Sequence, residues 1–341
     1  MKKISLFLSV LFLLILSSCE LKQILPDTRI FYVGVALDYK NTNVNSLHGT
    51  LNDGYEMEKA FNKNAKKCNE RFFNYSLYQE GFDHDEDTIS SPNYPSKSNI
   101  LSAFDDISKK AEKTDITVFY FSGHGSKEGG ALLCGTTDSI GGKTMTDINV
   151  IDDKYLLTPI EIKHRLSKIK GKKLIIVDSC YSGNFYSDSE DTVDISERDD
   201  YYQSSFEKFF DNNESSSDKD IFILCATESD NFSHEPSSLL HSHPHGYFTR
   251  ALLEGIGWNY GEYGTVTNKT EESVVADDGI QGKLGHGNPP ACYSSNSLSI
   301  DNLYRYIKEN QDIPLKITDG QRSHQHPRVS GGRKDLILFQ Y

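Results

Sequence analysis

Two apolar runs, each ending in a short segment of small and polar residues, constrain the fold of this chain most strongly. Ile-Thr-Val-Phe-Tyr-Phe at 116–121 leads into Ser-Gly-His-Gly, and Leu-Ile-Ile-Val at 174–177 leads into Asp-Ser-Cys. Apolar runs of this kind are typical of buried parallel strands. In open α/β sheets the chemistry takes place at the carboxyl ends of the strands. We therefore expect His124 and Cys180 at one rim of a parallel sheet, where a thiol and an imidazole can act together.

The rest of the chain alternates between strand patterns and helix patterns. Strand patterns cover 29–37, 72–79, 116–121, 172–178, 220–226 and 334–340. Helix patterns cover 51–66, 96–113, 246–256 and 299–310, and Thr158-Pro159-Ile160-Glu161 is typical of the start of another helix. This alternation predicts an α/β fold with a mostly parallel central β-sheet and helices on both faces.

Composition narrows the class of protein. The chain has 341 residues, of which 37% are hydrophobic and 11% aromatic, so it can form a sizeable core. Its formal net charge of −13 argues against a nucleic-acid partner, because phosphate binding needs clustered Lys and Arg. The same charge is compatible with a basic substrate.

The N-terminal segment is typical of an export signal. Lys2 and Lys3 precede an apolar run over residues 4–16, which is shorter than the roughly 20 residues that a membrane-spanning helix needs. The run ends in Leu16-Ser17-Ser18-Cys19, which resembles a bacterial lipobox and so implies cleavage before Cys19 and lipid attachment to its sulfur. The alternative is an ordinary signal peptide that happens to end at a cysteine.

From this segment we predict a signal peptide over 1–18, a tether over 19–28 and one domain over 29–341. The protein would then be exported and lipid-anchored to a bacterial cell membrane, on a face that the sequence leaves open. Two stretches within the domain have the composition of insertions, an acidic one over about 186–219 and a Gly/Ser/Thr-rich one over about 259–297.

The remaining cysteines fall into two kinds. Cys134 and Cys225 lie in apolar strand-like runs and are predicted to be buried core residues. With Cys19 set aside five cysteines are left, and this odd number leaves at least one free thiol, for which Cys180 is the natural choice. A pairing of Cys68 with Cys292 stays open.

The segments Phe-Ser-Gly-His-Gly at 121–125 and Asp-Ser-Cys-Tyr-Ser-Gly at 178–183 resemble the caspase-like cysteine peptidases, in particular metacaspases and bacterial metacaspase-like proteins. Further segments at 47–61, 225–235, 246–255 and 325–339 are similar to family segments in the same order, so the resemblance covers most of the mature chain. One departure is Tyr181, where the metacaspase pattern most often has His.

The resemblance implies a caspase-like fold and a cysteine endopeptidase with Cys180 as nucleophile and His124 as its acid/base partner. A thiol needs a nearby positive charge or a base to react at neutral pH, and His124 can supply either. By analogy with the family, the backbone N–H groups of Gly125 and Cys180 form the oxyanion hole.

The resemblance also implies a substrate pocket. Asp53, Ser122 and Asp178 match its positions, with Thr50 at the rim. Two carboxylates that face one cavity repel each other and are stabilised by a guanidinium or ammonium group between them. We therefore expect a protein or peptide substrate with Arg or Lys at P1, the residue before the cleaved bond. The alternative for Asp53 is that it caps the helix that begins nearby.

The chemistry requires no cofactor, but many metacaspases need Ca²⁺ for activation. Asp152 and Asp153 match part of the family's calcium cluster and Asp188 lies one residue from another member. The alternative is that these aspartates are solvated loop residues. The histidines at 234, 241, 243 and 245 lack the spacing and the accompanying cysteines of a zinc site, so metal binding there is disfavoured.

Two other functions remain open. One is a catalytically silent caspase-like module that only binds, although such modules usually lack the His or the Cys. The other is a transamidase of the same fold, which shares the acyl-enzyme and passes the acyl group to an amine instead of water.

Overall fold

The structure is a computed structural model that describes residues 28–40, 44, 46–79, 91–126, 130–135, 153–180, 220–227, 233, 235, 244–259, 283–310, 317–318, 321–322, 327–330 and 336–341. Its centre is a seven-stranded sheet in the order β14-β8-β7-β4-β1-β2, with β3 also paired to β1. The strands are β1 (Arg29–Ala36), β2 (Arg71–Asn74), β3 (Leu77–Tyr78), β4 (Ile116–Ser122), β7 (Lys172–Asp178), β8 (Ile221–Cys225) and β14 (Arg328–Ser330).

Pairing within this sheet is parallel except at one edge. β1 is parallel to β2, β3 and β4, β4 to β7, and β7 to β8, whereas β14 runs antiparallel to β8. In register, Ser122 lies opposite both Ala36 and Asp178, so β1, β4 and β7 end side by side. The predicted mostly parallel sheet is confirmed, and the predicted strand over 72–79 is divided into β2 and β3.

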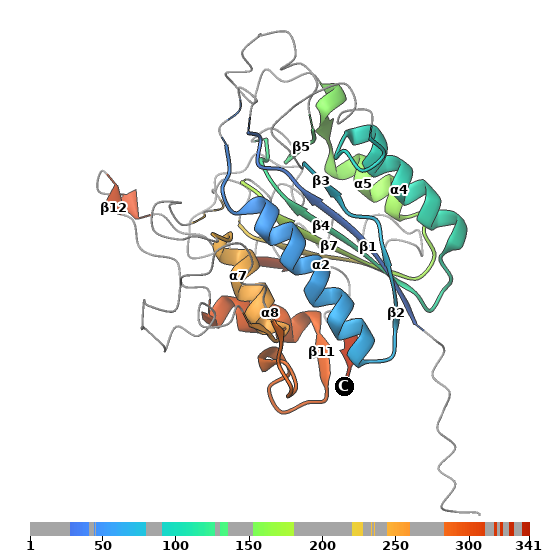
Figure 1. Ribbon diagram of the computed structural model, residues 1–341, viewed down its shortest axis with the longest axis vertical. Coiled ribbons are helices and arrows are strands. Elements are labelled where there is room, and N and C mark those ends of the chain that lie inside the picture. The colour runs from blue at the N-terminus through green and yellow to red at the C-terminus, as the bar shows by residue number, and fades with distance from the viewer. Residues whose placement is uncertain are drawn as a thin grey trace, which may run out of the picture.

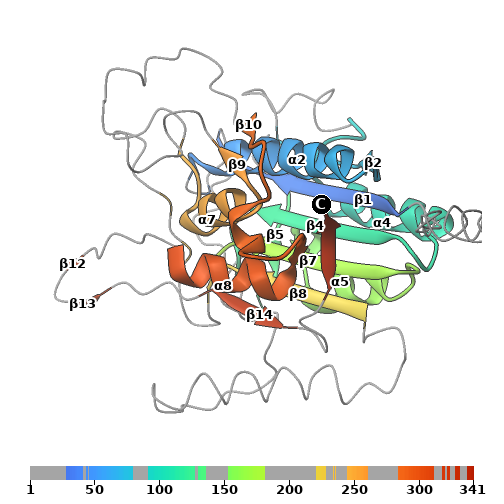
Figure 2. The ribbon, with the colours of Figure 1, turned by 90° about the horizontal axis from the view of Figure 1, so that it is seen from below.

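Helices cover both faces of the sheet (Figures 1 and 2). One face carries α2 (Thr50–Lys67), α7 (Tyr247–Gly255) and α8 (Ile300–Asn310), and the other carries α4 (Lys97–Lys110) and α5 (Pro159–Leu166). Strand residues alternate between the two cores: Val118 and Tyr120 pack with α2 and α7, whereas Phe119 and Phe121 pack with α4 and α5. The predicted α/β class with helices on both faces is therefore confirmed.

Capping explains where two helices begin. The Ser96 side chain accepts a hydrogen bond from the Asn99 N–H at the start of α4. At the start of α5, Thr158 and Glu161 form the predicted capping box, with Pro159 in the first turn. α2 differs, because its N-cap Gly49 has no side chain to donate or accept.

Short elements complete the structure. They are β5 (Leu132–Leu133), η3 (Asp153–Tyr155), β6 (Leu156–Leu157), β9 (Trp258–Asn259), β10 (Lys283–Leu284), η8 (Pro290–Cys292), β11 (Ser297–Ser299), β12 (Ile317–Thr318), β13 (Gln321–Arg322) and β15 (Ile337–Gln340). The strand predicted over 334–340 is present as β15, but it pairs with β11 outside the central sheet.

The two predicted insertions differ in what the structure describes. Residues 186–219 lie outside the described residues, as do residues 260–282 of the stretch 259–297. The described end of that second stretch packs into the α7–α8 core through Ala291 and Cys292. In the described residues, no helix combines the length and the apolarity needed to cross a membrane.

Candidate active site

The site forms where β4 and β7 end at the same rim of the sheet. Gly123 and His124 follow the last residue of β4, and Ser179 and Cys180 follow the last residue of β7. The Gly123 N–H donates to the Asp178 carbonyl at 3.2 Å, so the two strand ends remain paired. By strand alternation Ser122 and Asp178 face the α2–α7 side, as Tyr120 and Ile176 do. One pocket forms there, lined by Leu47, Thr50, Asp53, Ser122, Gly123, His124, Asp178, Ser179, Cys180, Ser233, Glu235 and Gly246.

Contacts to the backbone and the ring of His124 hold it in place. Its N–H donates to the Tyr39 hydroxyl at 3.0 Å, and its carbonyl accepts from the Leu133 N–H at 3.0 Å. The Tyr39 hydroxyl donates in turn to the Leu133 carbonyl at 2.6 Å. The Tyr39 and His124 rings pack with their centroids 4.7 Å apart. These contacts place His124 from the end of β1 and from β5, which are far from it in sequence.

Cys180 is half-buried and its thiol is neutral at physiological pH. Its Sγ donates to the Ser233 carbonyl at 3.7 Å. Burial raises the pKa of Cys180 to about 11. The Asp178 charge adds to the rise, and hydrogen bonding to the sulfur from the backbone at Ser233 and at Cys180 itself opposes it. Nucleophilic attack by this sulfur therefore requires a base to take the proton.

Gly125 lies against the backbone of Cys180. A Cβ on Gly125 would lie 2.1 Å from the Cys180 carbonyl oxygen, so no larger residue fits there. Gly125 forms a β-bridge with Leu132 whose hydrogen bonds come from the neighbouring Ser126 and Leu133 N–H groups. Within the part of the chain that the structure describes, the N–H groups of Gly125 and Cys180 make no hydrogen bond to another residue. Both donors are available to a ligand.

Asp53 is a buried carboxylate on the core-facing stripe of α2. Ser122 Oγ donates to its Oδ2 at 2.9 Å, the His245 Nδ1 lies 2.8 Å from its Oδ1, and the Gly246 N–H contacts both oxygens at 3.2 and 3.3 Å. Burial, followed by the charge of Asp178, raises the pKa of Asp53 well above its usual value. The alternative that Asp53 caps its own helix is wrong, because the N-cap is Gly49 and it has no side-chain capping bond.

Asp178 is the second buried carboxylate of the pocket. It accepts from Ser233 Oγ at 2.5 Å and from the N–H and Oγ1 of Thr249 at 3.2 and 2.7 Å. Thr249 Oγ1 uses its proton for this bond, so the Tyr120 hydroxyl, 2.8 Å away, donates to Thr249. Burial raises the pKa of Asp178, and these donors oppose the rise.

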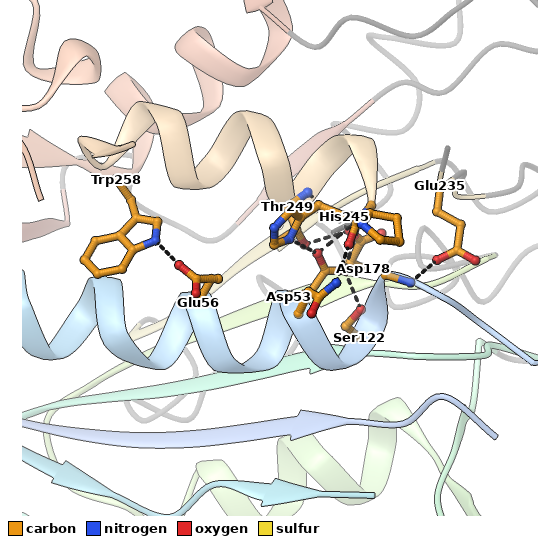
Figure 3. A network of polar contacts seen from close by, with 12 residues as sticks. Asp53, Glu56, Ser122, Asp178, Glu235, His245, Thr249 and Trp258 are labelled. Atoms are coloured by element: carbon orange, nitrogen blue, oxygen red, sulfur yellow. Dashed lines mark hydrogen bonds and ion pairs between the residues drawn. The ribbon is translucent and has the colours of Figure 1, made fainter. Parts of the chain in front are cut away.

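Gly246 lies next to both carboxylates. Figure 3 shows Asp53, from α2, and Asp178, from β7, converging. A Cβ on Gly246 would lie 2.4 Å from the Asp178 Oδ2 and 3.3 Å from the Asp53 Oδ2. A side chain there would push the carboxylates apart, and only glycine leaves both oxygens in place. Thr50 lines the same pocket while its Oγ1 donates to the Leu37 carbonyl at 2.7 Å.

Four residues of the site were missed from the sequence: Ser233, Glu235, His245 and Thr249. Glu235 is a third carboxylate of the pocket, and its two oxygens accept from the N–H groups of His48 and Gly49 at 2.9 and 2.7 Å. Glu235 thereby supplies the cap that α2 lacks from its own N-cap residue. The available signal was that these residues lie in or beside segments 225–235 and 246–255, which resemble segments of the family.

Of the tentative calcium candidates, Asp153 is the one that the structure describes. Cys19, Asp152 and Asp188 lie outside the described residues, and Asp153 begins η3. The described residues contain no group of three or more His, Cys, Asp or Glu side chains that could hold a metal ion. His234, His241 and His243 also lie outside them, whereas His245 is paired with Asp53.

The structure describes five cysteines, and all of them are free. Cys134 and Cys225 are buried in the core beneath α4 and α5, as predicted from their apolar runs. Cys68 and Cys292 are likewise free thiols, which answers the question that the sequence left open.

Comparison with known proteins identifies the family to which this chain belongs. Two similar solved structures are protein GSU0716 from Geobacter sulfurreducens (15% identity, TM-score 0.45, 92% of this chain and 97% of that chain covered) and caspase-1 from Spodoptera frugiperda (11% identity, TM-score 0.47, 92% and 91% covered). A comparison with curated proteins gave no match. The family model described as "Caspase domain" matches residues 35–308, which include every described residue of the pocket. The chain therefore belongs to the caspase domain family of cysteine peptidases.

Proposed function

We propose that this protein is a cysteine endopeptidase that hydrolyses peptide bonds after Arg or Lys by means of Cys180 and His124. The observation that carries the proposal is one pocket in which a cysteine and a histidine at adjacent strand ends lie beside three carboxylates, those of Asp53, Asp178 and Glu235. A basic side chain is the group that such a pocket stabilises best.

The chemistry follows the positions of the strand-end residues. His124 takes the proton of the Cys180 thiol as Sγ attacks the carbonyl carbon, and the oxyanion accepts hydrogen bonds from the free N–H groups of Gly125 and Cys180. When the tetrahedral intermediate collapses, the C–N bond breaks, and the imidazolium of His124 gives its proton to the leaving amine. Water, deprotonated by His124, then hydrolyses the thioester and releases the thiol.

Substrate recognition and thiol activation are coupled through Asp178. Its negative charge is one cause of the raised pKa of Cys180. A guanidinium or ammonium group bound next to Asp178 acts in the opposite direction and lowers that pKa. A substrate with a basic P1 residue would then bind more tightly and also meet a more reactive nucleophile.

The membrane anchor and calcium remain proposals that rest on the sequence. A lipid on Cys19 would hold the domain at a membrane through the tether 19–28, and incorporation of a labelled fatty acid that Cys19→Ala abolishes would support it. Asp152 and Asp188 lie outside the described residues, so the calcium proposal rests on the resemblance to the family alone. Full activity in excess chelator would dismiss a calcium requirement.

The test is an assay of the purified full chain on fluorogenic peptides that differ only in an Arg, Lys or Asp at P1. We expect cleavage after Arg and Lys, none after Asp, and none by Cys180→Ala. Cys68→Ala is the matched control, because Cys68 is a half-buried free cysteine at the other end of α2 and does not line the pocket. Silence on all three peptides would favour a binding module, and preferential transfer to an added amine would favour a transamidase.

A further inference from the structure

His245 is the one member of the histidine-rich stretch that the structure describes, and it lies beside the pocket rather than in a metal site. Its side chain is 7% exposed, and its Nδ1 lies 2.8 Å from Asp53 Oδ1. Figure 3 shows its ring directed at the carboxylate of Asp53. The catalytic steps proposed above do not use His245, so its burial against a carboxylate calls for another explanation.

The segment that carries His245 is fastened to the first turn of α2. The Asn52 side-chain amide donates to the Pro244 carbonyl at 3.0 Å, and the Gly246 N–H donates to the Asp53 carboxylate. A Cβ on Gly49 would lie 3.1 Å from the His245 backbone, which shows how closely the helix start approaches the segment. The His245 ring is therefore held at a fixed position relative to Asp53.

Asp53 needs such a donor in order to stay charged. It is 1% exposed, and Asp178 faces it across Gly246. Burial and a neighbouring negative charge both favour the protonated form of a carboxyl group. Without an imidazole N–H, the donors to Asp53 would be Ser122 and the Gly246 N–H, and a proton on Asp53 would remove one negative charge from the pocket.

We propose that His245 is a positioning residue of the P1 pocket, whose Nδ1–H keeps Asp53 ionised and thereby sets the preference for a basic P1 side chain. This inference rests on the proposed function. His245 acts through Asp53 and does not itself line the pocket. Besides Asp53 from α2, the described residues that line the pocket include two further carboxylates, Asp178 from β7 and Glu235, which binds the N–H groups at the start of α2. All three are acidic, so they favour a hydrogen-bond donor at this position.

The experiment compares kcat/KM for two peptides that differ only in Arg or citrulline at P1, because citrulline is a neutral side chain of nearly the same shape. The full-length wild type, His245→Leu, which removes the donor, and His245→Asn, which keeps an N–H at about the position of Nδ1, are measured from pH 5 to 9. His164→Leu is the matched control, since His164 is exposed on α5 and far from the pocket.

We expect His245→Leu to lower the Arg/citrulline ratio about tenfold at pH 7, the effect of losing one charge-assisted hydrogen bond. The lower Arg/citrulline ratio should arise from a higher KM for the Arg peptide. The pH below which this ratio falls should be higher in His245→Leu than in the wild type. His245→Asn should keep the ratio within about threefold of wild type, because the donor remains. His164→Leu should leave the ratio unchanged.

Three outcomes would overturn the inference. An unchanged ratio in folded His245→Leu would show that Asp53 needs no help from His245. A collapsed Arg/citrulline ratio in folded His245→Asn would show that the N–H donor does not set the P1 preference. The His245→Asn measurement decides the question even if His245→Leu does not fold. A wild type that cleaves both peptides equally would contradict the proposed function itself, and the inference with it.

Discussion

The two sides of the pocket are organised in opposite ways. On the recognition side, Asp53 and Asp178 each accept hydrogen bonds from several donors and are almost fully buried. On the catalytic side, Cys180 Sγ has a single long contact to a carbonyl, and two neighbouring N–H groups are free within the described residues. Under the proposed function, this difference means that the charge that would recognise the substrate is in place in advance, whereas the thiol stays neutral until a substrate arrives.

The largest expected effect comes from removing the nucleophile. Cys180→Ala should lower kcat/KM on an Arg-P1 peptide by about 10⁴-fold or more, because Cys180 is the one thiol among the described residues that line the pocket. It should leave the binding of the peptide nearly intact, since the recognition side is untouched, and equilibrium binding by fluorescence anisotropy would measure this. A variant that lost binding as well as turnover would erase the distinction between the two sides.

The second prediction concerns the resting thiol. With the pKa of Cys180 raised to about 11, its rate of alkylation by iodoacetamide should rise about tenfold per pH unit, or about 1,000-fold from pH 7 to pH 10. The sign follows because only the thiolate reacts and its fraction grows until the pH reaches the pKa. Site-resolved mass spectrometry separates Cys180 from the other cysteines. A rate that is already at its plateau at pH 7 would show a resting thiolate.

Asp178→Asn should separate recognition from chemistry. We expect kcat/KM on the Arg peptide to fall about 100-fold, as is typical when one partner of a buried charge pair is removed. Alkylation of Cys180 should become faster, because Asp178 raises the pKa of the thiol. Slower alkylation, or an unchanged preference for Arg, would place Asp178 outside the recognition side.

A related pH effect tests the same carboxylates in the wild type. The pKa values of Asp53 and Asp178 are raised, chiefly by burial, so both should become protonated at a pH above the value near 4 at which free aspartate titrates. The KM for the Arg peptide should therefore rise, by about tenfold, as the pH falls from 7 to 5, while that for a citrulline peptide stays nearly constant. Parallel changes for both peptides would point to His124 or to the fold instead.

The smallest effect is expected at the support of the histidine. Tyr39→Phe removes the hydroxyl that accepts from the His124 N–H and donates to the Leu133 carbonyl. We expect a loss of about 1–3 kcal/mol of stability, because two buried groups lose a partner, and a drop of only a few-fold in kcat. Thermal unfolding measures the loss of stability, and kcat on the Arg peptide measures the loss of activity. A loss of kcat as large as that of Cys180→Ala would show that His124 is held much less firmly than its contacts indicate.

Local pattern was enough to predict that His124, Asp178 and Cys180 lie at one rim of the sheet. Each lies within three residues of the end of an apolar run, so the strand pattern and the rule of carboxyl-end chemistry bring them together. Asp53 needed the resemblance to the family, because nothing in its own segment shows that the start of α2 lies against β4 and β7.

The remaining recognition residues depend on contacts that no local pattern encodes. His245 is 192 positions from Asp53 in sequence, and Glu235 is 186 positions from Gly49. Their roles depend on where the segments after β8 and before α7 run, and polar loop segments carry no periodicity from which such a path can be inferred. The sequence disfavoured metal binding at the histidine-rich stretch, but only the structure pairs His245 with a carboxylate.

The central claim is that a preformed recognition side lies next to a neutral nucleophile. Its most direct test is covalent labelling with two chloromethyl ketone peptides that differ only in having Arg or Asp at P1. Such reagents bind through the P1 side chain and alkylate the catalytic cysteine, so they report on both sides at once. We predict that the Arg reagent modifies Cys180 stoichiometrically at pH 7 and that the Asp reagent does not. Equal labelling by both reagents, or labelling of another cysteine, would contradict the account.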